Sequence, residues 1–404
     1  YATPRVATIP SLPTGIMKSN HRKFLILAVK LSVAVALMAW VLNRTHWNDF
    51  IRTRDGQTYP VISGGHGEGE WQVRTGMLWW SGQRTLATAD LEPVGEQAGV
   101  VRRPGFASSI RGIRVGLLAA AGVGWLAALF VITIRWWLLL RIQDIRISLW
   151  EAIRLSFLGQ FFNLVVPGTV GGDLVKAYYA AKHTPRKAAV LLSVFVDRLL
   201  GLAELTLIAS LALAVALATG LGNWADPMMK SCATAVGVAV AMLAFVVVVM
   251  LSVRLRNVLH LQKFYRRLRI AHQISAAGDA VRLYRRRWRH LARAIVWTIG
   301  APFMWVASAA LVGQSLALEV SWHEYFLYIP LIYIIGAVPL TPGGVGWIEN
   351  LYLAFFVVAN PSGVLAFALL ARLIPMFWAL PGVVVAFTGP RTPEARAMQA
   401  ELGM

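Results

Sequence analysis

The sequence predicts an all-α polytopic membrane protein of about six spanning helices and two oppositely oriented re-entrant hairpins in an inverted repeat, with a small β-rich extracytoplasmic insertion. Three observations lead to this fold class. Hydrophobic residues make up 57% of the 404 residues, and charged residues only 14%. Several apolar runs reach the roughly 18 to 20 residues that cross a bilayer as a helix. A Pro-Gly-x-Val-Gly core occurs twice, in the stretches 165–180 and 339–356.

The predicted spanning helices follow the apolar runs. The first, 24–42, comes after a basic N-terminal tail, 1–23. Its apolar part is about 19 residues long and no small-x-small cleavage site follows, so we expect an uncleaved helix rather than a signal peptide. The other five spans are predicted at 116–134, 188–219, 231–253, 291–318 and 363–387.

The basic residues predict the orientation of these helices. The connections 176–187 and 254–293 are rich in lysine and arginine, which marks them as cytoplasmic. Both termini, including a short tail over 388–404, are then cytoplasmic as well. The net charge of +20 therefore indicates contact with anionic lipid headgroups at the cytoplasmic face rather than nucleic-acid binding.

Two further apolar runs are broken by the repeated motif. The run 155–175 is flanked on both sides by basic residues, among them Arg135 before it. Both of its ends should therefore lie on the same side of the membrane. This predicts a re-entrant hairpin that turns at Pro167-Gly168. The run 325–359 follows three spans later, so it should enter from the opposite face. Such inverted repeats place broken helices near the midplane, where non-helical backbone must be buried in protein or line a cavity. The alternative is close helix packing through small residues.

The polar insertion, 43–112, separates the first two spans. Its short alternating pieces QTYPVI, EWQVR and RTLATA lie between glycine-rich turns, which predicts a small β-rich domain outside the cytoplasm. We expect Trp71, Trp79 and Trp80 to fill its core, with contact to the bilayer surface or a ligand as the alternative. His66 lies in a glycine-rich turn without partners for a catalytic triad.

Ionisable residues within lipid are costly, which makes Asp173 and Lys176 of the first hairpin candidates for function. Asp173 is either the N-cap of a helix or part of a phosphate site at that helix N-terminus, where free N–H groups and the helix dipole attract anions. Lys176 lies one turn later on the same face and would hold the anion. The predicted substrate-binding set is completed by Pro167, Gly168, Gly171, Gly172 and Arg372.

The second hairpin has its own carboxylate. Glu349 and Asn350 follow the glycines of the break, which are Gly343, Gly344 and Gly346. Glu349 is either a proton or cation coupling site or the partner of an arginine in another helix. Arg372, halfway along the last span, is either a substrate clamp or that structural partner, and the sequence favours neither.

Five more polar residues are predicted to line the cavity or take part in coupling. Asp197, Arg198 and Glu204 lie on one helix after the first hairpin, where a structural network with Arg198 paired to a carboxylate is the favoured interpretation. Gln160 and Asn163 lie on the first arm of the hairpin.

Patterns typical of enzymes are missing from the sequence. The stretch GTVGGDLVK does not end in the Gly-Lys-Ser/Thr of a phosphate-binding P-loop. The stretch WHEY has no second histidine at helical spacing, so it is not a zinc-protease helix, and the sequence has no Gly-x-Ser-x-Gly nucleophile motif. The single cysteine, Cys232, excludes an intramolecular disulfide framework and a cysteine-cluster zinc site. We therefore predict no catalytic residue, no metal and no cofactor.

Four stretches carry a family resemblance: RWWLLL (135–140), FLGQFFNLVVPGTVGGDLVKAYY (157–179), VDRLLGL (196–202) and PLTPGGVGWIE (339–349). They resemble the flippase-like membrane domain of lysylphosphatidylglycerol synthases, over about residues 20–42 and 113–388. The resemblance implies a stand-alone member in a prokaryotic cytoplasmic (inner) membrane, without the synthase domain and its activity. Two features depart from the family pattern: Lys176 replaces an arginine that is frequent there, and the insertion 43–112 is unusual.

Together these observations predict a lipid flippase or translocase. An anionic or polyprenyl-phosphate-linked lipid would pass its headgroup through a cavity between the hairpins, coupled to protons through Asp173 or Glu349. A polar groove lowers the large cost of taking a headgroup through hydrocarbon. The alternatives are a membrane-embedded headgroup transferase, a transporter of small soluble ions, and a scaffold whose insertion recruits partners. The sequence does not indicate which lipid is moved or the oligomeric state.

Overall fold

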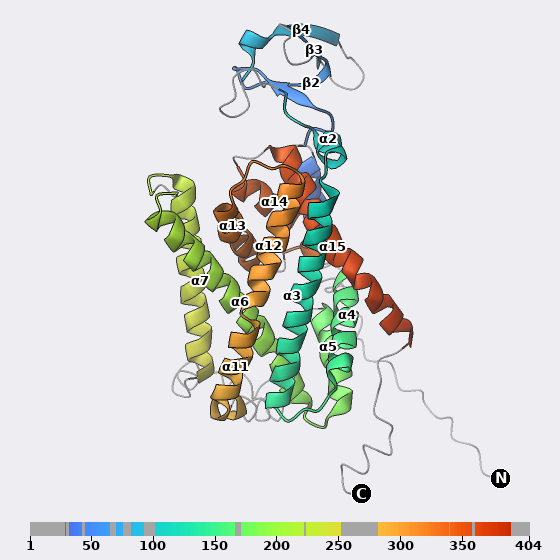
Figure 1. Cartoon of the computed structure of the whole chain (residues 1–404), viewed down its shortest axis with the longest axis vertical. Coiled ribbons are helices and arrows are strands. Elements are labelled where there is room, and N and C mark those ends of the chain that lie inside the picture. Colours follow the sequence, from blue (N-terminus) through green and yellow to red (C-terminus); the bar gives the residue numbers. More distant parts are fainter. Residues whose placement is uncertain are drawn as a thin grey trace, which may run out of the picture.

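The protein is a helical bundle with a small antiparallel sheet at one end (Figure 1). We describe a computed structural model of the chain. The described residues are 29, 32–42, 45–64, 70–75, 82–92, 102–165, 171–221, 224–251, 282–338, 340–357 and 360–388. Within them, helices account for the predicted membrane region and strands for the predicted insertion.

The described residues contain five helices that are long and apolar enough to cross a membrane. They confirm the five spans predicted after the insertion. Of the predicted first span, 24–42, a helix is described over Ser32–Leu42, and most of the remainder lies outside the described residues. The five are α3 (Val115–Ile142), α6 (Lys187–Ala218), α7 (Pro227–Leu251), α11 (Trp288–Thr298) continued by α12 (Gly300–Ser315), and α15 (Pro361–Thr388).

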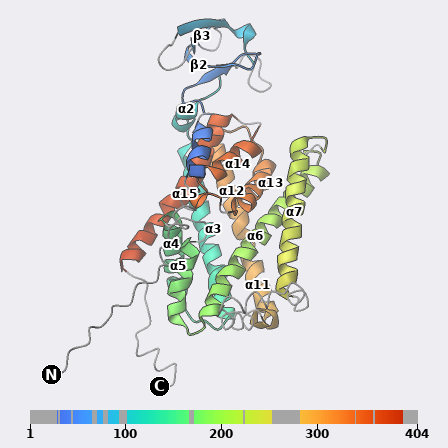
Figure 2. The same cartoon turned by 180° about the vertical axis from the view of Figure 1, so that it is seen from behind.

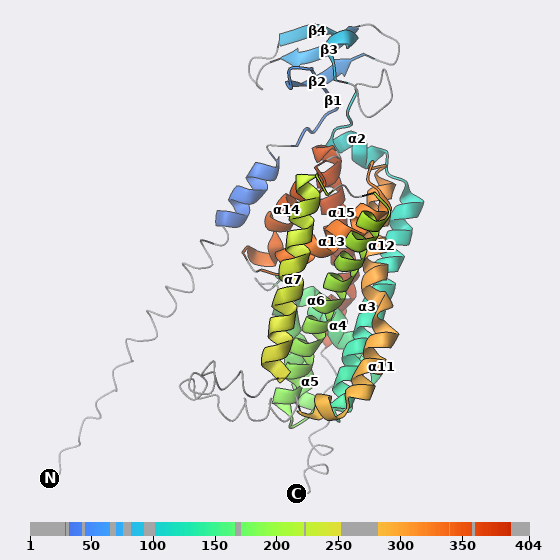
Figure 3. The same cartoon turned by 90° about the vertical axis from the view of Figure 1, so that its left-hand side faces the viewer.

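The surface of the bundle is apolar where a soluble protein would be polar. Helix α7 lies at the outside of the bundle (Figures 1 and 3) and exposes Val238, Met242 and Phe245, with more than half of each side chain accessible. A continuous exposed apolar surface of this kind is costly in water but matches the hydrocarbon of a bilayer. The chain is a multi-pass membrane protein.

Two pairs of shorter helices lie at opposite ends of the bundle. Helices α4 (Leu149–Val165) and α5 (Gly171–Ala180) occupy the end far from the sheet, and α13 (Trp322–Gly336) and α14 (Trp347–Phe355) occupy the end near it (Figures 1 and 2). At 1.5 Å per residue, the 17 residues of α4 span about 25 Å, less than a bilayer core. The pairs lie at the broken runs 155–175 and 325–359, and the first pair extends beyond its run on both sides. Their re-entrant course through a membrane stays a prediction, and the predicted turn at Pro167-Gly168 lies outside the described residues.

The two pairs connect the rest of the bundle. Helix α4 packs against α5 and α15, and α13 packs against α6 and α12. Helix α13 begins at a capping box in which the backbone N–H of Ser321 donates to Glu324 at 2.8 Å. Between α13 and α14 a short turn, η3 (Pro342–Gly344), replaces regular helix. Helices from both halves of the chain therefore hold each other in place.

The insertion contains the predicted small β domain. Strands β1 (Phe50–Arg52), β2 (Thr58–Ser63), β3 (Glu70–Thr75) and β4 (Gly82–Ala87) form one antiparallel sheet in sequence order. Trp71 fills its core together with Ile51, Val73, Leu86 and Leu91, as predicted, and its ring N–H donates to Thr88 at 3.1 Å. Trp79, Trp80 and His66 lie outside the described residues.

A short helix and a few polar contacts join the sheet to the bundle. Helix α2 (Phe106–Arg111) follows the sheet and packs against α15. The backbone N–H of His46 donates to Ser362 at 3.1 Å, and the amide of Asn360 donates to the carbonyl of Pro104. The sheet is thus tied to the start of α15.

Candidate functional site

Two groups of charged side chains lie within the helical bundle. The first, which we call the α3–α5–α6 cluster, consists of Arg135, Asp173, Lys176, Asp197, Arg198 and Glu204. The second, the α14–α15 cluster, consists of Glu349, Asn350 and Arg372 with the glycines of the break before α14. Both contain buried ion pairs, and in a membrane such groups are retained for pairing or for function.

Arg135 is the centre of the first cluster. Its side chain is only 3% exposed, and its Nε donates to Asp197 at 2.7 Å while Nη1 is paired with Glu204. Asp197 and Glu204 are seven residues apart on α6, so they lie on one face two turns apart. We had assigned Arg135 to the basic residues that flank the first hairpin; instead α3 continues to Ile142 and holds it inside the bundle. Sequence reasoning missed this residue as a site member.

Asp173 and Arg198 form the more accessible pair of this cluster. Arg198 binds the carboxylate of Asp173 through Nε and Nη2, and the Arg198 side chain is 53% exposed against 15% for Asp173. Asp173 is the third residue of α5 and lies in the first turn of the helix rather than at its N-cap. The prediction that Arg198 pairs with a carboxylate is confirmed by this contact.

Lys176 is buried instead of facing an open phosphate site. Its Nζ lies 3.7 Å from the ring centroid of Trp136 on α3, which is a cation–π contact. The carboxylates of Asp197 and Asp173 attract its charge electrostatically. The cluster as a whole has three cations and three carboxylates and is neutral by charge count.

The start of α5 is packed tightly against α4. A Cβ at Gly172 would lie 1.8 Å from the carbonyl oxygen of Gly159, so only glycine fits there. The backbone N–H of Gly172 donates to Asn163 at 2.8 Å, which satisfies one of the free N–H groups of the first helical turn. Asn163 is therefore a helix-terminus partner, and Gln160 lies half-buried on the same helix. Gly171 begins α5, whereas Pro167 and Gly168 lie outside the described residues.

In the second cluster, Glu349 is held from two sides. Its Oε1 accepts from Arg372 Nε at 2.7 Å and its Oε2 accepts from the backbone N–H of Gly346 at 2.8 Å, and the residue is 1% exposed. Arg372 also donates to the carbonyls of Gly343 at 3.0 Å and Gly344 at 3.2 Å. The alternative in which Arg372 is the structural partner of Glu349 is the one seen in this structure.

The three glycines of this break have backbone conformations that other residues rarely adopt. Gly343, Gly344 and Gly346 have φ values of +61°, +68° and +76°. This conformation turns the carbonyls of Gly343 and Gly344 toward Arg372. Asn350 adds a link to the N-terminal helix, because its amide donates to the carbonyls of Gly346 at 2.6 Å and Leu37 at 3.2 Å.

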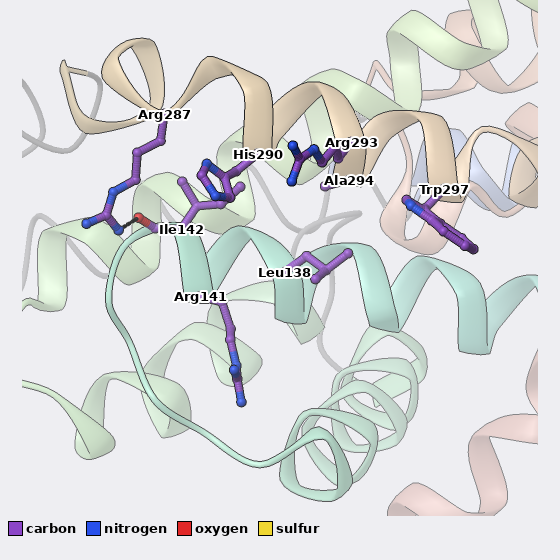
Figure 4. Close-up of a pocket in the computed structure, with 8 residues that line it drawn as sticks. All are labelled: Leu138, Arg141, Ile142, Arg287, His290, Arg293, Ala294 and Trp297. Atoms are coloured by element: carbon purple, nitrogen blue, oxygen red, sulfur yellow. Dashed lines mark hydrogen bonds between the residues drawn. The ribbon is translucent and has the colours of Figure 1, made fainter.

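Two pockets formed by described residues are not lined by the charged side chains of these clusters. One, of about 630 Å³, lies between α3 and α11 and is drawn in Figure 4. The other, of about 10 Å³, has room for about one water molecule and borders Tyr333 and Tyr352. Neither is lined by Asp173, Lys176, Glu349 or Arg372. Among the described residues no group of three or more histidine, cysteine, aspartate or glutamate side chains is placed to hold a metal ion.

Comparison with protein families gives one match. Residues 104–382 match the model of the lysylphosphatidylglycerol synthase TM region. The match begins just before α2 and ends within α15, so it includes both charged clusters and leaves out the four-stranded sheet. The comparison with curated proteins finds no match.

Proposed function

Because this chain belongs to the family of the lysylphosphatidylglycerol synthase TM region, we propose that it translocates an anionic or polyprenyl-phosphate-linked lipid between the leaflets of a prokaryotic cytoplasmic membrane. The observation that carries the proposal is the two pairs of short helices at opposite ends of the bundle, each of which contributes a carboxylate to an ion pair, Asp173 with Arg198 and Glu349 with Arg372. In membrane transporters, discontinuous helices of inverted repeats surround the substrate site near the midplane.

The charged clusters offer a lipid headgroup the polar contacts that hydrocarbon cannot provide. A headgroup that crosses hydrocarbon loses its hydrogen bonds, at several kcal/mol for each group. The α3–α5–α6 cluster provides three cations, of which Arg198 is the most accessible and Lys176 lies one turn along the same helix as Asp173. Hydrogen bonds from Arg198 and Lys176 to a bound phosphate would recover much of the free energy that is lost when the headgroup leaves water.

Charge balance suggests how protons are coupled to this step. The cluster is neutral with Asp173, Asp197 and Glu204 ionised, so a bound phosphodiester would leave one excess negative charge in a low-dielectric site. Protonation of Asp173 releases Arg198 for the phosphate and restores neutrality. One proton would therefore travel with each monoanionic headgroup.

The arginine-rich end sets the orientation we propose. Arg141, Arg146, Arg186 and Arg287 lie at the ends of α3, α6 and α11 that face away from the sheet (Figure 1). Cytoplasmic loops of membrane proteins carry such an excess of basic residues. The α4–α5 hairpin then enters from the cytoplasm, and the β domain and the α13–α14 hairpin lie on the outer side.

The conformation described here buries Glu349, Lys176 and Arg135 and leaves Arg198 about half exposed. Translocation therefore requires the hairpins to move relative to α6 and α15, against which they pack. Asp173 and Arg198 lie at the most exposed part of the first cluster and would be the first contact of an entering headgroup.

Movement of fluorescent anionic lipids in proteoliposomes tests this proposal. Dithionite quenches only label in the outer leaflet, so wild-type protein should allow nearly all label to be quenched. Lys176→Ala and Glu349→Gln should leave about half protected, as in empty liposomes. Lys182→Ala, whose ammonium lies over Tyr178 and Tyr179 at the α5 end, is the matched control and should behave as wild type.

Each variant must first be shown to be folded by size-exclusion chromatography in detergent. Wild-type protein that matches empty liposomes for phospholipids and for polyprenyl phosphates would refute the proposal. We assign the chain no catalytic step, and mass spectrometry that finds a covalently altered lipid after incubation would favour a headgroup transferase instead.

A further inference from the structure

The pocket between α3 and α11 has no role in the proposed route and lies outside both charged clusters. It measures about 630 Å³, within the range of pockets that hold small-molecule ligands. Figure 4 shows Arg287, at the N-cap of α11, and His290, Arg293, Ala294 and Trp297 of α11 on one side, with Leu138 and Ile142 of α3 on the other. The α11 residues recur every three or four positions, which puts them on one face of the helix. We call it the α3–α11 groove.

The charges of the groove are mostly positive. Arg287 is held in place, since its Nη1 donates to the carbonyl of Ile142 at 2.8 Å and to Asp144 at 2.7 Å. Asp144 is also 3.7 Å from Arg186. Arg293, in contrast, forms no ion pair with any described residue and is exposed.

Arg141 borders the groove on α3 but adds no donor to it. In Figure 4 its side chain leaves α3 on the side turned away from α11, and its guanidinium lies 4.6 Å from the ring centroid of Trp137. The groove therefore has one fixed arginine, one arginine without an acidic partner and a histidine that can donate a hydrogen bond. This donor set suits a phosphate group, which arginine recognises through two parallel hydrogen bonds.

The other end of the groove is apolar and open to the surroundings. Trp297 is 81% exposed and the adjacent Val296 is 70% exposed, where α11 continues into the membrane-spanning α12. Tryptophan is enriched at the membrane–water interface, and basic residues just outside a span meet anionic headgroups. A charged half and an apolar half along one groove match the two parts of a phospholipid.

We propose that the α3–α11 groove binds an anionic phospholipid of the cytoplasmic leaflet, with its phosphodiester at His290 and Arg293 and its acyl chains along Trp297 and α12. This lipid is a bound regulatory or structural lipid, not the one that is translocated. The inference does not depend on the proposed flippase activity, because it concerns the outer face of α3 and α11.

Native mass spectrometry of the purified 404-residue chain, titrated with phosphatidylglycerol, tests the inference. Wild-type protein should bind phosphatidylglycerol in a saturable manner and more tightly than phosphatidylcholine. The double variant His290→Ala/Arg293→Ala loses one neutral and one charge-assisted hydrogen bond and should bind roughly ten- to a hundredfold more weakly. The matched control is Arg289→Ala, on the same helix but with its guanidinium 5.9 Å from the Trp288 ring and outside the groove.

Three results would overturn the inference: equal binding of phosphatidylglycerol and phosphatidylcholine, equal affinity in the double variant and wild type, or the same loss in the control. A further arm adds inorganic phosphate, which should not displace the lipid; displacement would show a phosphate-ion site in place of a lipid site. Lipid movement in proteoliposomes should persist in the double variant, so a failed flippase assay and a failed binding assay can be told apart.

Discussion

Replacement of Arg135 by methionine tests the central ion pair of the α3–α5–α6 cluster. The guanidinium is 3% exposed and is the partner of two carboxylates, on Asp197 and Glu204. Methionine is apolar, unbranched and compatible with a helix, so the change removes the charge and keeps part of the side-chain volume. What remains is two carboxylates, largely buried, without their cation.

The expected loss of stability follows from this burial. Removal of one partner of a buried ion pair costs about 3–5 kcal/mol, because the other charge stays in a low-dielectric site. The double variant Arg135→Met/Glu204→Gln removes one cation and one carboxylate, so the cluster is again neutral by charge count, and it should recover to within about 1–2 kcal/mol of wild type. Arg141→Met, an exposed position on the same helix, should change stability by about 0.5 kcal/mol or less.

Thermal unfolding in detergent, followed by intrinsic fluorescence, measures these differences. A loss of this size should lower the unfolding midpoint of Arg135→Met by on the order of 5 to 10 °C. The reasoning is refuted if Arg135→Met unfolds at the wild-type midpoint, or if the double variant Arg135→Met/Glu204→Gln is as unstable as the single one. Either result would mean that the carboxylates do not depend on Arg135 for their charge balance.

Two further predictions concern a helix contact and the β domain. Gly172→Ala places a Cβ 1.8 Å from the Gly159 carbonyl oxygen and should lower the free energy of unfolding by about 1–3 kcal/mol. In the control Gly237→Ala the new Cβ meets nothing within 4 Å, so this change should be neutral or stabilising. Thermal unfolding of both variants measures the difference. In the β domain, burial raises the pKa of the Asp49 carboxyl, but hydrogen bonds from Ser108, the Gly105 backbone and Arg102 outweigh it and leave the pKa below the usual 3.8. The stability from Asp49 is therefore present above pH 3.8 and is lost as the pH falls through the lower folded-state pKa. Hydrogen exchange at β1, corrected for intrinsic rates, should show this loss in wild type and not in Asp49→Asn; an equal pH response in both would contradict it.

The elements of the fold could be predicted because their signals are local. Apolar runs of membrane length became α3, α6, α7, α11–α12 and α15, and alternating pieces between glycine-rich turns became β2, β3 and β4. The broken runs became two pairs of short helices, because proline and several glycines are concentrated at each break, whereas isolated prolines such as Pro375 and Pro381 lie inside α15. Each of these outcomes depends on neighbouring residues in the chain.

The partners of the charged residues were decided by the tertiary structure. Arg135 meets Asp197 across 62 positions of sequence, and Arg372 meets Glu349 across 23. From the sequence, Arg135 looked like one more basic residue beside a hairpin, and Lys176 like an open anion ligand rather than a cation under Trp136. Hydrophobicity and turn chemistry accumulate along the chain, whereas an ion pair depends on which helix faces which, and that is set only when the whole bundle packs.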